Sequence, residues 1–120
     1  MTSLSNYIEV VETAYETMLA YAAQGRESDL PANPSADTPP SEIRLLLTGL
    51  KQALHHIQSS LSGSAVRFAE VVVDDIYKVD TALELVLGQT DLGSELIDNL
   101  NASIHLRAVL TDLFLLDDTQ

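Results

Sequence analysis

The chain contains no cysteine and no tryptophan, and only 5% of its 120 residues are aromatic. The absence of cysteine excludes a disulfide framework, a thiolate metal site and a cysteine nucleophile. With so few aromatic side chains, the interior must be built from aliphatic residues, which suits helix-on-helix packing. At this length we expect one helical domain, residues 1–120, with a single core.

A long apolar run is also missing. Five charged residues interrupt the most aliphatic stretch: Arg67, Glu70, Asp74, Lys78 and Asp80. This stretch is therefore not expected to span a membrane. The N-terminus lacks a basic region, and Glu9 and Glu12 fall where a signal peptide would need apolar side chains. We expect a cytoplasmic protein without membrane contact.

Basic residues are scarce, six against 18 acidic residues, and the formal net charge is −12 at pH 7. This charge would repel a phosphate backbone and an anionic membrane surface, so direct nucleic-acid binding is not expected. A basic protein partner would be attracted. Solubility alone is the simplest interpretation of the acidity, and mimicry of nucleic acid is the sharper alternative.

What the chain has instead is a ladder of aliphatic residues at alternating steps of four and three. Its rungs are Ile43, Leu47, Leu50, Leu54, Ile57 and Leu61. This spacing is typical of one buried helix face. Similar ladders predict further helices over about 5–23, 65–87 and 94–116. The four prolines of the chain fall within 25–40 and predict an extended, mobile linker there.

The predicted fold is therefore all-α, a four-helix bundle with a long proline-rich linker between its first two helices, and dimeric. The second helix is expected over about 39–62, with Thr38 as its cap and Pro39 in its first turn. Because the apolar register runs on across Gly63, a continuous helix through both ladders, in an intertwined dimer, is the alternative. A turn is favoured, since glycine between two serines makes a poor helix interior.

Some apolar and charged side chains fall where the core pattern does not explain them. Val71, Val73 and Leu85 lie away from the core stripe of the 65–87 helix, and we expect them at a homodimer interface. Arg107 falls within the apolar arc of the 94–116 helix, an arc that includes Ile104 and Phe114. This position predicts a buried, paired arginine, an arginine at a dimer interface, or a stem on the core with its guanidinium in solvent.

Four acidic residues are candidates for contacting a partner: Glu70, Asp74, Asp98 and Asp112. If the acidity mimics nucleic acid, their carboxylates should line one surface. Neutralising them should then abolish partner binding without unfolding the protein.

Two adjacent histidines, His55 and His56, are expected at or near the solvated face of their helix. An exposed histidine on a four-helix bundle is what a phosphotransfer domain presents to a response regulator. Such domains carry a lysine three residues later, whereas Gln58 and Ser59 occupy those positions here. The likeness is one of architecture alone.

No residue pattern predicts catalysis, a metal site or a cofactor. The Glu-x-x-His pairs of di-iron bundles are absent, and Gly-Ser-Ala at 63–65 is not a nucleophile elbow. The favoured function is a small acidic module that binds a protein partner as an adaptor, inhibitor, immunity-type protein or chaperone-like subunit. Phosphotransfer through His55 or His56 and a structural role in a larger assembly are the alternatives.

Overall fold

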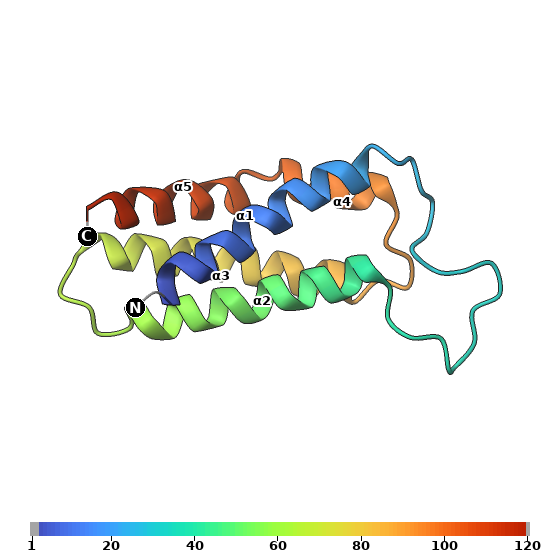
Figure 1. The fold of residues 1–120 in the computed structure, drawn as a ribbon, viewed down its shortest axis with the longest axis horizontal. Coiled ribbons are helices and arrows are strands. Elements are labelled where there is room, and N and C mark those ends of the chain that lie inside the picture. The colour runs from blue at the N-terminus through green and yellow to red at the C-terminus, as the bar shows by residue number, and fades with distance from the viewer. Residues whose placement is uncertain (1–2, 120) are drawn as a thin grey trace.

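The computed structural model describes residues 3–119, which contain five α-helices and no strand. The helices are α1 (Ser3–Ala22), α2 (Glu42–Leu61), α3 (Phe68–Leu87), α4 (Ser94–Ala102) and α5 (Ile104–Asp118). α1 packs against α2, α4 and α5, while α3 packs against α2 and α5. Figure 1 shows α4 and α5 end to end along the molecule. The predicted all-α class is confirmed.

The aliphatic ladder of α2 faces the centre of the core. Its first five rungs are at most 4% exposed, and Leu61 at the end of the helix is partly buried. The same core cluster includes Val11 and Met18 of α1, Val72 and Ile76 of α3, and Leu106 and Leu113 of α5. Each fully buried side chain of this kind contributes about 2 kcal/mol. The ladder is therefore a major source of stability.

A turn separates α2 from α3. Gly63 has a φ of 78°, a left-handed conformation that glycine adopts without steric cost. The serine hydroxyl of Ser64 then accepts a hydrogen bond from the Val66 N–H, at 3.1 Å, which holds the chain outside a helix. α3 therefore begins at Phe68 instead of residue 65, and the alternative of a continuous helix is wrong.

The start of α2 also differs from the prediction. Ser41, and not Thr38, is the cap, because its hydroxyl accepts a hydrogen bond from the Arg44 N–H at 3.2 Å. Pro39 lies outside the helix. The reason is that Pro40 follows it, and a residue before proline is driven out of the α region.

The helix predicted over 94–116 is interrupted at Ser103, whose φ of −61° and ψ of 139° are those of an extended residue. The Ser103 hydroxyl donates to the Leu100 carbonyl at 2.7 Å, a bond that competes with helix continuation. The extended residue resets the helical phase, so that α5 buries its own apolar set: Leu106, Val109, Leu110, Leu113 and Leu116.

This change of phase overturns three expectations about the last helix. Ile104 is 74% exposed and Phe114 is 40% exposed, although both were predicted in the core. Arg107 is exposed as well, so the prediction that it is buried is wrong. An uninterrupted helix would have turned all three toward the core.

The two ends of the molecule hold different segments (Figure 1). The long loop between α1 and α2 and the loop between α3 and α4 lie at one end. The α2–α3 turn lies at the other end, with the start of α1 and the end of α5. No helix within residues 3–119 is both long and apolar enough to cross a membrane.

Candidate functional site

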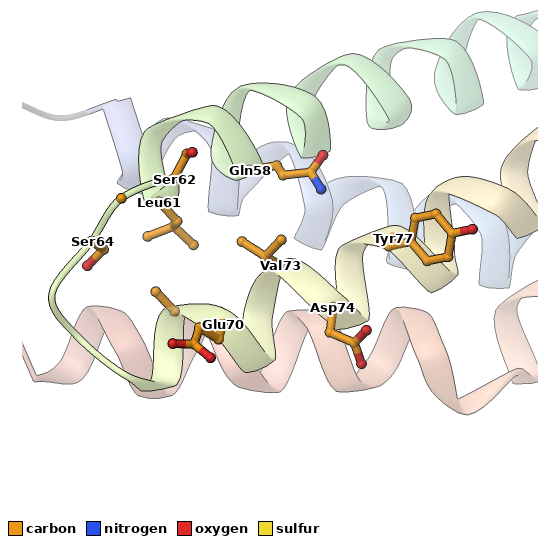
Figure 2. A pocket seen from close by; sticks show the side chains of 10 residues that line it. Gln58, Leu61, Ser62, Ser64, Glu70, Val73, Asp74 and Tyr77 are labelled. Carbon is orange, nitrogen blue, oxygen red and sulfur yellow. The ribbon is translucent and has the colours of Figure 1, made fainter.

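A groove runs between the end of α2 and the first half of α3, next to the turn that joins them. We call it the α2–α3 groove. It has a volume of about 630 Å³. Its lining is Gln58, Leu61, Ser62, Gly63, Ser64, Ala69, Glu70, Val73, Asp74 and Tyr77. Figure 2 shows Leu61 of α2 and Val73 of α3 pointing into the space between the two helices. The groove therefore has an apolar floor.

Carboxylates lie at the α3 side of this floor. Glu70 and Asp74 are one helical turn apart and both exposed (Figure 2). Asp74 pairs with Lys78, at 3.3 Å between Oδ2 and Nζ, and both of these side chains are about half exposed or more. Glu70 has no cation within 4.0 Å among residues 3–119. Since α2 contributes no charged side chain to the lining, the rim carries net negative charge.

The structure brings together two of the four acids proposed to contact a partner. Glu70 and Asp74 share the α2–α3 groove. Asp98 of α4 lines a separate hollow at the opposite end, beside the loop that follows α1. Asp112 of α5 is half-buried against Asp75 of α3. The four carboxylates therefore do not form one continuous surface.

The three apolar residues assigned to a dimer interface are also separated. Val73 lines the α2–α3 groove, whereas Leu85 lies almost at the other end of α3, in a hollow with Gln89 and Leu96. Val71 and Val73 are two residues apart on one helix, so they point about 200° apart around its axis. Val71 and Leu85 lie only about 40° apart around the same axis, so one contact surface could include these two residues without Val73.

Both histidines are exposed, and both contact side chains of neighbouring helices. His55 Nε2 lies 2.9 Å from Asp80 Oδ1, and Lys51 Nζ lies 2.6 Å from the same oxygen. A phosphoryl group on His55 would meet the Asp80 carboxylate. The His56 ring stacks on Tyr7 of α1, with centroids 5.2 Å apart and planes at 5°. Both rings are thus engaged in contacts between helices.

A buried carboxylate that the sequence patterns did not reveal lies at the loop end of the molecule. The Asp29 side chain is 1% exposed although it belongs to the linker. It accepts hydrogen bonds from the Leu92 N–H, at 2.8 Å, and from the Ser41 hydroxyl. Arg44 Nε donates to it at 3.0 Å. The linker is therefore anchored here, contrary to the expectation of extended, mobile backbone throughout 25–40.

These contacts decide the charge of Asp29. Burial by itself would raise the pKa of its carboxyl group. The hydrogen bonds from Ser41 and Leu92, together with the charge of Arg44, outweigh burial and hold that pKa below its ordinary value. Asp29 is therefore an ionised, structural carboxylate.

Arg44 extends this cluster to the end of α3. Its two Nη atoms donate to the carbonyls of Leu87, Gln89 and Thr90, at 3.2, 2.5 and 2.8 Å. Carbonyls at the end of a helix have no partner within the helix, so the guanidinium satisfies them. One arginine thereby joins the start of α2, the linker and the α3–α4 loop. All its contacts are within the chain, which indicates a structural role.

Within residues 3–119 no three potential metal ligands come together. No family model, curated protein or solved structure matches the chain. The residues themselves are therefore the basis for a functional proposal, and the α2–α3 groove is the strongest candidate site.

Proposed function

We propose that this chain is a small acidic helical module that acts by binding a protein partner, and that the α2–α3 groove receives a basic segment of that partner. The supporting observation is an apolar floor beside a rim of carboxylates, in a chain of net charge −12. An amphipathic segment with Lys or Arg beside an apolar side chain matches both features. The apolar side chain would lie against Leu61 and Val73, and the cations near Glu70 and Asp74.

The charge of the whole chain would assist this binding. Like charges spread over a small surface produce a field that attracts a cationic partner and raises its association rate. Salt screens such a field over about 10 Å at ordinary ionic strength. The proposed complex is therefore expected to weaken strongly as salt is added.

Several finer expectations belong to the same proposal. α4 and α5 would act as one interrupted fourth helix of a four-helix bundle. A homodimer and a cytoplasmic location stay predictions, as does the choice among an adaptor, an inhibitor, an immunity-type protein and a chaperone-like subunit. A second copy of this chain is a poor occupant for the groove, because its surface is also acidic.

The experiment measures binding of a labelled amphipathic helix of lysine and leucine, at low and at high salt. Wild type should bind, and the Glu70→Gln/Asp74→Asn variant should bind about tenfold more weakly. The matched control is Glu9→Gln/Glu16→Gln, which removes the same charge from exposed positions of α1. We expect this control to retain most of the affinity.

Two results would contradict the proposal. Equal losses in both double variants would mean that net charge alone attracts the peptide and that the groove is not the site. The proposal would also be contradicted if the peptide changes amide chemical shifts only outside residues 58–77. Once the groove is supported, capture from a lysate at both salt concentrations can name the natural partner.

A further inference from the structure

Two carboxyl groups face each other where α3 packs against α5. Asp75 of α3 and Asp112 of α5 lie within hydrogen-bonding range of one another. The Asp75 side chain is 18% exposed. Asp112 Oδ2 is shielded from solvent, and no donor within residues 3–119 reaches it. Both groups are acceptors when ionised, so a bond between them requires a proton on one of them.

Cations near the pair are few. Lys78 Nζ lies 3.8 Å from Asp75 Oδ1, but it is closer to Asp74, at 3.3 Å. No lysine, arginine or histidine of α1, α2 or α4, among the residues described, comes within 4.0 Å of either carboxylate. On α5 itself, His105 lies two turns before Asp112, about 10 Å along the axis. Two negative charges at this contact would therefore repel each other with little compensation.

The protonation of Asp112 follows from these surroundings. Burial, then the hydrogen bond with Asp75, then the repulsion from that carboxylate raise the pKa of Asp112 from 3.8 to about 7. Asp112 therefore keeps its proton under mildly acidic conditions.

We propose that Asp75 and Asp112 share one proton that fastens α5 to α3, and that loss of this proton loosens α5. The pair is then a pH-sensitive latch between the two helices. It is held by one hydrogen bond below its transition and opened by repulsion between two carboxylates above it. This inference is independent of the α2–α3 groove, since Asp75 and Asp112 do not line the groove.

The direction of the pH dependence follows from proton linkage. Between pH 3.8 and about 7, the unfolded chain has lost the proton that the folded chain keeps. Over this range the pair makes the unfolding equilibrium constant rise about tenfold per pH unit. Above it both states are ionised and the contribution becomes flat. Asp29 acts at lower pH, because the pKa of its carboxyl is lowered.

The test is urea unfolding of the full chain across this pH range, for wild type, Asp112→Asn and Asp75→Asn. Each asparagine is nearly the same size and donates to the remaining carboxylate. Asp112→Asn should lose the one-proton slope, Asp75→Asn should lose the part of it that the pair causes, and both should be more stable than wild type above pH 7. Asp98→Asn, on the exposed side of α4, is the control and should keep the wild-type slope.

Carboxyl carbon NMR titration provides a readout that does not depend on unfolding. Asp112 should titrate near pH 7 in the folded wild type, and this step should vanish in Asp112→Asn. The inference is overturned if no carboxyl group titrates near pH 7, or if Asp112→Asn keeps the slope. It is also overturned if calcium stabilises wild type above pH 7 and Asp112→Asn abolishes the effect, because the pair would then hold a cation.

Discussion

At one end of the molecule, hydrogen bonds join loops that are far apart in the sequence, whereas at the other end the chain bonds only to its neighbours. At the loop end, the Ser94 N–H donates to the Arg26 carbonyl at 2.7 Å and Asp29 binds the Leu92 N–H. At the turn end, the bonds of residues 62–67 span at most four positions within the described chain. Figure 1 shows that the two ends are separated by the length of the helices.

This difference indicates where a partner can bind. The buried polar groups of the loop end, Asp29 and Ser94, already have partners within the chain, so a ligand would have to displace them. The turn end keeps an open apolar floor and a carboxylate, Glu70, with no cation within 4.0 Å among the described residues. We therefore interpret the loop end as structural and the turn end as the surface free for contact.

The substitution expected to change stability most is Asp29→Ala, at the loop end. Removing the carboxylate leaves the Leu92 N–H and Arg44 Nε without their acceptor, and takes from the partly buried guanidinium its one carboxylate partner among the described residues. Loss of one partner of a buried pair costs about 3–5 kcal/mol, and we expect that decrease in the free energy of unfolding. Urea denaturation followed by circular dichroism measures it.

Asp37→Ala is the matched control, because Asp37 lies in the same loop but is exposed. It should change stability by less than about 0.5 kcal/mol. A similar small effect for Asp29→Ala would remove the distinction between the two ends.

The contribution of Asp29 to stability has a definite pH dependence. It is present above the ordinary pKa of 3.8 and is lost as the pH falls from there through the lower folded pKa.

The patterned parts of the fold were predictable from the sequence. A ladder of large aliphatic residues predicts both a helix and the face that the helix buries. The rungs of α2 from Ile43 to Ile57 are indeed buried. The turn at Gly63 could be predicted because glycine beside serine disfavours a helix. Glu70 and Asp74 were identified as candidates from charge, although the groove beside them needs the packing of α2 on α3.

The unpatterned parts could not be predicted. Asp29 is one carboxylate in a proline-rich loop, and its burial depends on Arg44 and Leu92, which lie far along the chain. The interruption at Ser103 rests on one hydroxyl in a sequence of ordinary helical appearance. That single extended residue changed the predicted environment of Ile104, Arg107 and Phe114.

Two glycine substitutions, with expected changes of intermediate size in the free energy of unfolding, sharpen the comparison. A Cβ on Gly93 would lie 2.8 Å from the Glu27 carbonyl oxygen, because the α3–α4 loop and the linker approach closely there. Gly93→Ala should therefore cost about 1–3 kcal/mol. Gly49→Ala, in α2 with open space around it, should instead gain about 0.5–1 kcal/mol. Urea denaturation measures the change in the free energy of unfolding for each variant. Changes of opposite sign support the close contact at Gly93, and changes of the same sign contradict it.

The smallest expected effect on stability is at the turn end. In Glu70→Gln/Asp74→Asn, relief of the repulsion between two acids one turn apart offsets the loss of the Asp74–Lys78 pair. Each effect is about 0.2–0.5 kcal/mol, so the free energy of unfolding should hardly change. Peptide binding by the same variant should fall. A large loss of stability would instead mean that these carboxylates hold the turn end together, and they could not then be assigned to a partner.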